Sequence, residues 1–495
     1  MAPTDHDPLA HTLTRSILGA AGLYCLVKPL STADLCVFMK MGELMATRGG
    51  LAEQEVFSFS EIGRTFINGT WLSQRIFYEV FSLGGYPLLV LLLTTCVVLT
   101  LGVVAHHGRM RGGREGMGTA AAAWAFVLLL QNLGLRPQTF SLPCFALSYL
   151  IADIYRDRRW APVALAVIYS LWANLHGAFP AGLVVMGGLV GGEILRALRE
   201  GGLSGLRQDR GTRRLILLTL VAFLATWMGP YGPHIYTYVA ENSSMPSTRL
   251  LDEWLPAAPL SFMGVRLYGS ALILGVLALT TRALRPGDVA LALAFLWLAH
   301  GSQRMILWWG LITAPMVAQL LAARRPLPSG TPLPLHHTLL KGSTIFWIVM
   351  VLLGNPWLER QDSGRATAEG FSGLERDTPV EAINVLEKLP AQGAHVYADM
   401  MWGGYVLWRL WPSYSPMVDP RIWVFGDSTW EDWLSIGLAE PGWEEKLARY
   451  QVDILLLEKH RQGNLHAAVS SGAGWGLLYE DERSALWRRM ETEPQ

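Results

Sequence analysis

Polar side chains suited to recognising phosphate or sugar stand at the ends of strongly apolar stretches. Arg136 and Gln138 flank a proline in one short connection, and Arg304 follows Gln303 in another. A guanidinium can bind phosphate through two parallel hydrogen bonds, so both arginines are candidates for holding a phosphate group at a membrane surface. Snorkelling to ordinary lipid phosphates is the simpler interpretation.

A second polar group lies between Trp172 and Gly177, at the end of another apolar stretch. Asn174 and His176 could hydrogen-bond a phosphate or a sugar, and Gly177 allows the chain to reverse. Polar residues at membrane depth are costly, which makes this segment a candidate binding site. The same side chains could equally bond neighbouring helices or cap the turn.

The acidic candidates for chemistry are Asp34, Glu43, Glu53, Glu55 and the group Asp252-Glu253-Trp254, and Asp34 is the best placed. Asp34 follows the first apolar stretch, and in a partly dry cleft it could act as general base toward an acceptor hydroxyl or amine. It is equally suited to cap a helix that starts at Leu35. Glu253 stands beside Asp252 and Trp254 in a long connection between apolar stretches.

The composition indicates that most of these residues are positioned by membrane-spanning helices. Hydrophobic residues make up 51% of the chain and charged residues 16%, whereas ordinary soluble domains carry about 25% charged residues. The formal net charge of zero does not suggest a nucleic-acid partner. The four cysteines are irregularly spaced, which fits neither a metal site nor a disulfide framework.

About eleven apolar stretches are expected to be spanning helices, although several are shorter than the roughly 20 residues that one span needs. The expected spans are 13–31, 86–106, 117–134, 139–155, 160–176, 179–197, 214–230, 263–281, 287–300, 305–322 and 342–357.

Every second connection is basic, which predicts the orientation in the membrane. The residues concerned are Arg109, Arg111, Arg114, Arg156, Arg158, Arg159, Arg196, Arg199, Arg207, Arg210, Arg213, Arg214, Arg282, Arg285, Arg324 and Arg325. Because basic loops stay in the cytoplasm, we expect a cytoplasmic N-terminus and place segments 32–85, 231–262 and 358–495 on the opposite side.

The sequence divides into a transmembrane domain, 1–357, and a soluble domain, 358–495. The large outer loop 32–85 is expected to hold interfacial helices, one over 35–47 and a second opened by Trp71. After Trp357 the chain becomes richer in charged residues, glycine and proline, and we expect a small α/β domain with a helix at 379–389, capped by Asp377 or Thr378. Its expected strands are 395–398, 405–410, 415–418 and 452–457.

The order of several short motifs resembles bacterial membrane proteins related to the GT-C glycosyltransferases. In the first 357 residues these are Asp34-Leu35, Phe57-Ser58-Phe59, Trp71-Leu72-Ser73, Arg136-Pro137-Gln138, Trp172 to Gly177, Pro230-Tyr231-Gly232 and Glu253-Trp254. In the C-terminal part they are Trp402 to Tyr405, Val418 to Arg421, Gly442-Trp443 and Tyr450 to Asp453.

The resemblance implies a GT-C-like fold in which the first outer loop carries a catalytic carboxylate and the sugar donor is lipid-phosphate-linked. By that analogy Asp34 is the carboxylate. The chain departs from the pattern where relatives place tryptophan, histidine and glutamate, because Cys36 to Phe38, Gly69-Thr70 and Gln74 stand there instead.

Two functions follow. The first is a membrane glycosyltransferase of the bacterial inner membrane that uses a polyprenyl-phosphate-linked sugar at the outer face, in the cell envelope. In it Asp34 is the catalytic residue, and substrate is bound by Trp71, Arg136, Gln138, Asn174, His176, Glu253 and Arg304. No ligand cluster demands a metal ion, although a divalent ion is possible. The alternative, motivated by the departures, is a catalytically inactive subunit that binds lipid, cofactor or membrane protein partners.

Overall fold

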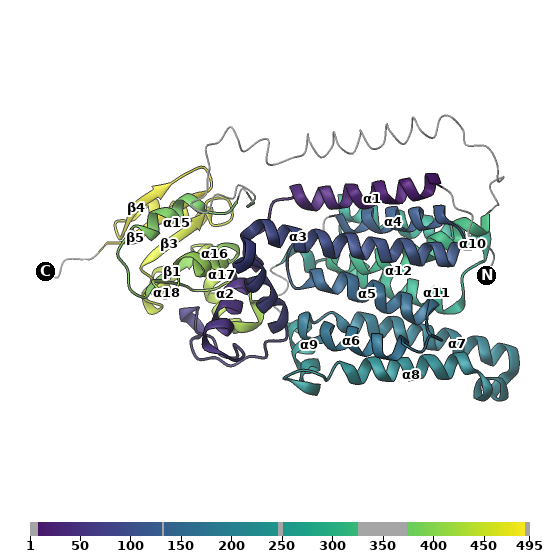
Figure 1. Cartoon of the computed structure of the whole chain (residues 1–495). Coiled ribbons are helices and arrows are strands. Elements are labelled where there is room, and N and C mark those ends of the chain that lie inside the picture. Colours follow the sequence, from purple (N-terminus) through teal and green to yellow (C-terminus); the bar gives the residue numbers. More distant parts are fainter. Residues whose placement is uncertain (1–7, 131–132, 246–250, 325–373, 376, 491–495) are drawn as a thin grey trace. The chain divides into compact units, whose positions relative to one another are not determined.

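The structure is a computed structural model, and it describes residues 8–130, 133–245, 251–324, 374–375 and 377–490 (Figure 1). Residue contacts divide the chain into two compact units. The helical unit comprises 1–28, 90–239 and 249–359, and the mixed unit comprises 29–89, 240–248 and 360–495.

The helical unit is a bundle of apolar helices. Neighbouring pairs in contact include α4 with α12, α7 with α11, and α6 with α8 (Figure 1). The helices are α1 (Pro8–Val27), the second part of α3 (Trp71–Gly112), α4 (Glu115–Leu129), α5 (Gln138–Ile154), α6 (Ala161–Leu175), α7 (Phe179–Gln208), α8 (Arg210–Ala225), α10 (Phe262–Thr281), α11 (Pro286–Gly301) and α12 (Ile306–Arg324). A further helix, α9 (Ile235–Ser244), lies where the two units divide.

Glycine lets α7 and α11 approach closely. A methyl group built on Gly192 would lie 2.6 Å from the Cα of Gly287, and one on Gly188 would lie 2.4 Å from the side chain of Leu291. Small residues at such crossings are typical of packed membrane helices, where association depends on close van der Waals contact.

The expected spans agree with the helices in position. Ten of the eleven stretches coincide with helices, and the eleventh, 342–357, lies outside the described residues. Four helices are long and apolar enough to cross a membrane by length and composition: Trp71–Gly112, Phe179–Gln208, Phe262–Thr281 and Gln303–Arg324. Three shorter helices, α4, α6 and α11, are also apolar. The full count of eleven spans therefore remains a prediction.

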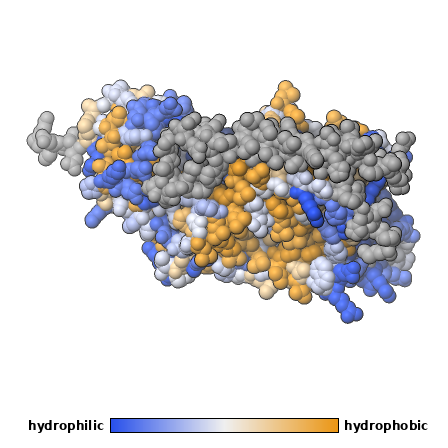
Figure 2. All heavy atoms as spheres, turned by 45° about the horizontal axis from the view of Figure 1, so that its top comes forward, coloured by the Kyte–Doolittle hydropathy of each residue, from blue (hydrophilic) through white to orange (hydrophobic). Residues whose placement is uncertain are grey.

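The outer surface of the helical unit is also apolar. Leu220, Leu272, Leu279, Leu293 and Trp297 are all more than half exposed. Figure 2 shows hydrophobic side chains gathered over the visible face of the helices. Soluble monomers rarely expose large contiguous apolar patches, so this surface supports a membrane location.

In the mixed unit, the first long connection packs against the C-terminal residues. Helix α2 (Ala33–Arg48) contacts α16 (Met400–Leu410), and most of its residues from Leu35 to Met45 are buried. The segment after α2 closes with a bridge between Gln54 and Thr65 and a short 3₁₀ turn, η1 (Phe59–Glu61). Helix α3 then starts at Trp71, as expected, and its helical backbone breaks at Gly84 and Gly85.

The C-terminal part of the mixed unit is a five-stranded sheet with the order β2-β1-β3-β5-β4. Strands β2, β1 and β3 run parallel, and β5 and β4 pair antiparallel beside them. The strands are β1 (Ala394–Ala398), β2 (Tyr414–Pro416), β3 (Ile454–Glu458), β4 (Trp475–Glu480) and β5 (Ser484–Arg489). The helices are α15 (Val380–Glu387), α16, α17 (Asp427–Gly437), α18 (Trp443–Arg449) and α19 (Gly463–Ser471).

Three local expectations were wrong. The expected strand 405–410 belongs to α16, whose first turn is capped by the carboxylate of Asp399 accepting from the Met401 N–H at 3.0 Å. Helix α15 follows Pro379 rather than a capping Asp377 or Thr378. Helix α2 begins at Ala33, so Asp34 lies inside its first turn and does not cap it.

Candidate functional site

The structure brings together three of the residues predicted to bind substrate. Glu253 lies between two arginines: its Oε2 is 2.7 Å from Nη1 of Arg136, and its Oε1 is 2.9 Å from Nη1 of Arg304. The three side chains, called here the arginine–glutamate cluster, come from three different connections of the helical unit. With two cations and one carboxylate, the cluster carries a formal charge of +1.

Short local structures hold the cluster. Glu253 lies in the 3₁₀ turn η5 (Asp252–Trp254), and its backbone carbonyl accepts a hydrogen bond from the hydroxyl of Ser302 at 3.0 Å. The Gln303 N–H donates to the carbonyl of Leu255, also at 3.0 Å. These bonds tie η5 to the turn that carries Arg304, so the two partners are positioned by backbone as well as by charge.

The cluster favours the ionised form of Glu253. Burial alone would raise the pKa of this carboxyl, but the positive charges of Arg304 and Arg136 outweigh burial and lower it below its usual range. The guanidinium of Arg304 also lies 5.0 Å from the ring of Trp254. The side chains are 18 to 28% exposed, so a solvent-borne or lipid-borne anion can reach the arginines.

His176 is held by a serine between helices. Nδ1 of His176 lies 2.8 Å from the Ser141 hydroxyl, which also accepts a hydrogen bond from Nε1 of Trp172 at 2.7 Å. The positive charges of Arg304 and Arg136 both act on the imidazole. His176 therefore lies within electrostatic range of the arginine–glutamate cluster.

The amide of Asn174 is used within the fold. Its Nδ2 donates to the carbonyls of Ser170 at 2.8 Å and Met228 at 2.9 Å, which joins the end of α6 to the segment after α8. A methyl group on Gly229 would lie 2.3 Å from Oδ1 of Asn174, so the fit is close. Gln138 is buried in the first turn of α5, and within the described residues its Oε1 accepts no hydrogen bond.

The remaining two predicted site residues lie in the mixed unit. Asp34 is half-buried in the first turn of α2, where a negative charge is stabilised by the helix dipole, and Trp71 is the first residue of α3. Their roles in substrate binding or catalysis stay predictions.

An amide pair lies at Gln74, where the resemblance leads us to expect an acid. The side chains of Gln74 and Asn68 exchange two hydrogen bonds of 2.8 Å, and Nε2 of Gln74 also donates to the hydroxyl of Thr70 at 3.0 Å. All three side chains are buried. An ionised glutamate could not donate to Asn68 and Thr70, so Gln74 fits this neutral cluster and not an acidic site.

Sequence reasoning missed the buried ion-pair triad of the mixed unit, which is formed by Glu55, Asp419 and Arg421. Arg421 is fully buried, with Nη1 at 2.8 Å from Glu55 and Nη2 at 2.6 Å from Asp419. Burial alone would lower the pKa of Arg421, but Asp419 and Glu55 raise it. The Ser58 hydroxyl adds a 2.9 Å bond to Asp419, so the first loop and the C-terminal residues share one charged core.

The pairing in this triad spans more than 360 positions of the chain, and each residue alone resembles a loop charge. The nearest signal was the resemblance itself, because Phe57 to Phe59 and Val418 to Arg421 were both recognised as motifs. Within the described ranges, no group of three His, Cys, Asp or Glu side chains is arranged to hold a metal ion.

Comparison with known proteins identifies the fold. No family model matches the chain, and no curated protein matches it by sequence. One similar solved structure is the archaeal oligosaccharyltransferase AglB from Archaeoglobus fulgidus in complex with an inhibitory peptide and a dolichol-phosphate. The sequence identity is 12% and the TM-score 0.56, and the match covers 93% of this chain and 72% of that chain. ArnT from Cupriavidus metallidurans bound to undecaprenyl phosphate matches at 13% identity with a TM-score of 0.52, over 98% of each chain.

A third similar structure is the arabinofuranosyltransferase AftD from mycobacteria, at 14% identity and a TM-score of 0.53, where 98% of this chain covers 40% of that one. At these identities the likeness concerns the fold and leaves the reaction open. The structural neighbours of this chain are GT-C glycosyltransferases, and its fold is of the GT-C type.

Proposed function

We propose that the chain is a membrane glycosyltransferase that takes its sugar from a polyprenyl-phosphate-linked donor at the outer face of a bacterial inner membrane. The observation that carries the proposal is the arginine–glutamate cluster within a GT-C fold, in which Arg136 and Arg304 converge on one carboxylate. Two of the similar structures hold a dolichol-phosphate and an undecaprenyl phosphate, which supports a lipid-phosphate ligand.

In the proposed reaction, an acceptor hydroxyl or amine attacks the anomeric carbon of the sugar. The bond between that carbon and the phosphate oxygen breaks, Asp34 takes the acceptor proton, and the lipid phosphate leaves with its negative charge. Arg136 and Arg304 bind that phosphate, which competes with Glu253 for the guanidinium groups. Gln138, Asn174, His176 and Trp71 are proposed to line the substrate site.

The proposal includes the topology expected from the sequence: eleven spans, a cytoplasmic N-terminus, and residues 358–495 outside. Cysteine labelling tests this orientation. A cysteine placed at Arg207, in a basic connection, is expected to resist a membrane-impermeant maleimide in intact cells, whereas one at Gly463, in the C-terminal part, is expected to react.

Lipid binding is tested with the double variant Arg136→Gln/Arg304→Gln. Hydrogen bonds to charged groups contribute about 1.5–3 kcal/mol each, so the variant is expected to bind undecaprenyl phosphate at least ten times more weakly. Arg324→Gln is the matched control, because Arg324 ends the helix that follows Arg304 and lies at its opposite end. Equal binding by all three proteins would contradict the proposed phosphate site.

Catalysis is tested by the Asp34→Asn variant with a polyprenyl-phosphate-linked sugar pool and a membrane extract as acceptor. Loss of transfer with retained lipid binding is expected if Asp34 is the base. Unchanged transfer would remove Asp34 from the mechanism.

The second candidate function is an inactive lipid-binding subunit of a membrane complex. The cluster of Asn68, Thr70 and Gln74 favours it, because neutral hydrogen-bonded side chains stand where the resemblance leads us to expect an acid. Purification in mild detergent separates the two functions: a stoichiometric partner without transfer activity supports the subunit, and a lone protein that transfers sugar supports the enzyme.

A further inference from the structure

A pocket lies at the opposite end of the helical unit from the arginine–glutamate cluster. Its volume is about 260 Å³, and its polar lining comes from α7, the start of α11 and the connection after α5. The charged lining residues are Arg156, Glu193, Arg196, Arg199, Glu200, Arg285 and Asp288. The close approach of Gly192 to Gly287 brings α7 and α11 together beside it. We call it the basic pocket.

The carboxylates of the basic pocket are already engaged. Glu193 accepts from Arg156 at one oxygen and from Arg196 at the other, both at 2.7 Å. Asp288 accepts from Arg111 at 2.6 Å and from Arg285 at 3.1 Å. Both oxygens of Glu193 and of Asp288 have donors, because Nη2 of Arg285 also reaches Oδ1 of Asp288 at 3.2 Å. The third lining carboxylate, Glu200, is exposed and accepts from Arg196 at 2.7 Å.

The arginines, in contrast, keep donors to spare. A guanidinium has five N–H groups. Among the described residues, Arg156 uses only Nη1 in side-chain bonds and Arg285 leaves Nη1 unbonded. Arg199 is exposed, and within the same part of the chain it forms no hydrogen bond or ion pair. The pocket therefore has more guanidinium donors than its carboxylates use, and an anion would supply the further acceptors.

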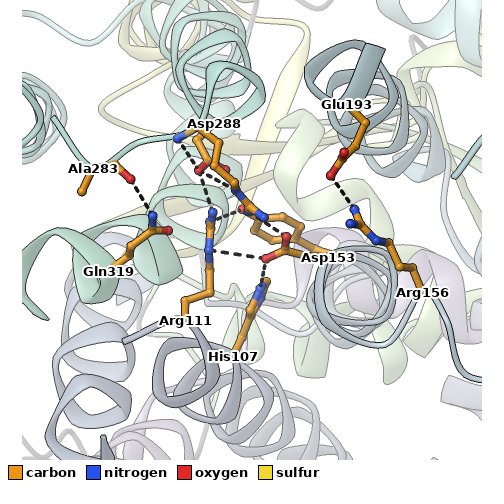
Figure 3. A network of polar contacts seen from close by, with 10 residues as sticks. His107, Arg111, Asp153, Arg156, Glu193, Ala283, Asp288 and Gln319 are labelled. Atoms are coloured by element: carbon orange, nitrogen blue, oxygen red, sulfur yellow. Dashed lines mark hydrogen bonds and ion pairs between the residues drawn. The ribbon is translucent and has the colours of Figure 1, made fainter. Parts of the chain in front are cut away.

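A buried network fixes one wall of the pocket (Figure 3). Arg111 lies between Asp153 and Asp288, Arg285 reaches Asp153 at 2.7 Å, and His107 lies 2.8 Å from the same carboxylate. Arg111, Asp153 and Asp288 are almost fully buried. Since Arg285 is held by two aspartates, its free Nη1 is oriented before any ligand arrives, which reduces the entropy lost on binding.

The surrounding connections add positive charge without a matching number of acids. Arg158 and Arg159 follow α5, and Arg210, Arg213 and Arg214 lie in the first two turns of α8. The acids next to them in sequence are Asp157 and Asp209. Arg214 also packs against the Arg156 turn, where it donates to the carbonyl of Arg156 at 2.9 Å. A field of this sign favours an anionic ligand over a neutral one.

We propose that the basic pocket binds a phosphate group through Arg156, Arg199 and Arg285, either in the headgroup of an anionic lipid or as inorganic phosphate. This site is separate from the proposed lipid-phosphate donor site and does not depend on it. A pocket of this volume accommodates one phosphate and a short polar headgroup, and its position at the basic ends of the helices matches the surface of an anionic leaflet.

The test uses the full chain, delipidated and reconstituted in discs of phosphatidylcholine. One arm titrates phosphatidylglycerol and counts lipids retained by native mass spectrometry, and the other titrates inorganic phosphate and follows thermal unfolding. Arg199→Ala is the test variant, because an exposed side chain can be removed without disturbing the bundle. Arg207→Ala is the matched control, because Arg207 is also an exposed arginine of the segment Phe179–Gln208 but lies beyond the break at Gly202 and outside the pocket.

The expected result is a loss of affinity of about fivefold for Arg199→Ala, since one arginine near an anionic surface contributes a change of about that size. Charge reversal in Arg199→Glu doubles the change in charge, so the expected loss is about 25-fold. Arg207→Ala is expected to bind as the parent does. A difference seen only with phosphatidylglycerol assigns the site to a lipid headgroup, and one seen with inorganic phosphate assigns it to the free anion.

Two outcomes would overturn the proposal. Binding of neither phosphatidylglycerol nor phosphate above phosphatidylcholine and chloride would show that the pocket holds no anion. If Arg199→Ala and Arg207→Ala weaken anion binding equally, the binding comes from general attraction to a basic surface and not from the pocket. Repeating the titration at about 1 M salt strengthens this comparison, because surface attraction is screened beyond about 3 Å whereas a pocket contact is screened less.

Discussion

The buried ion-pair triad allows a quantitative prediction for the variant Arg421→Met. Removing the cation leaves the carboxylates of Glu55 and Asp419 buried, and breaking such a pair costs about 3–5 kcal/mol. Both carboxylates keep other donors: Glu55 accepts from the N–H groups of Phe57 and Ser58, and Asp419 from the Ser58 hydroxyl. We therefore expect the lower end of that range, about 3 kcal/mol, for the mixed unit.

Hydrogen exchange of the full chain in detergent measures this loss locally. A loss of about 3 kcal/mol corresponds to exchange that is faster by roughly a hundredfold in the most protected amides. The effect should appear in α2 and in strands β1 and β3, while the amides of α5 and α12 in the helical unit keep their protection.

Two further variants decide whether charge burial is the cause. Arg449→Met removes an exposed arginine that pairs with Asp432, and it should change stability by less than about 1 kcal/mol. Adding Glu55→Gln and Asp419→Asn to Arg421→Met should restore at least half of the protection, since no buried charge is left. If Arg421→Met exchanges like the parent, or if the triple variant is worse than the single one, the argument from unpaired buried carboxylates is wrong.

Two other predictions concern the same unit. Burial alone would raise the pKa of Glu61, but bonds from Thr429, Gly426 and Arg64 outweigh burial and lower it, so these bonds stabilise the fold fully above the unfolded pKa of about 4.3 and are lost as pH falls through the lower folded pKa. Glu61→Gln should therefore lower the unfolding temperature at pH 7 and have little effect near pH 3. A difference in unfolding temperature that stays constant across this range would contradict the assignment. Gly404→Ala should lower the free energy of unfolding by about 1–3 kcal/mol in chemical denaturation, because its methyl group would lie 2.3 Å from the carbonyl oxygen of Ala33. Gly463→Ala is the control and should have little effect, because the space around Gly463 is open. Equal effects of the two variants would show that the α2–α16 contact is unimportant.

Hydropathy predicted the helical unit well because each span carries its own signal. The expected stretch 263–281 is α10, and 139–155 is α5, each within one residue at either end. Loop placement also anticipated the cluster, since Arg136, Glu253 and Arg304 were singled out separately before the structure showed them in contact. What hydropathy cannot supply is which connections meet.

The C-terminal residues were predicted less well because local preference and packing disagree there. Tyr405 to Leu410 is rich in β-favouring side chains, yet it is helical because Asp399 caps α16 and because Gly403 and Gly404 allow close packing on neighbouring backbone. Strands β4 and β5 were missed because neither shows alternation: β4 has no fully buried position, and β5 is buried over four consecutive residues. The ion pair between Arg421 and Glu55 was also missed, because only the tertiary fold brings these two residues together.

The joining of residues 29–89 with 360–495 in one compact unit has a consequence for biosynthesis. The first segment is complete about 270 residues before the second begins, an interval of roughly 15–55 s at about 5–20 residues per second. During that time the apolar faces of α2 and the acid Glu55 have no partners from the C-terminal part. We expect the nascent chain to depend on a holding chaperone at this segment, and a chain truncated before residue 360 to be degraded even when its helices insert.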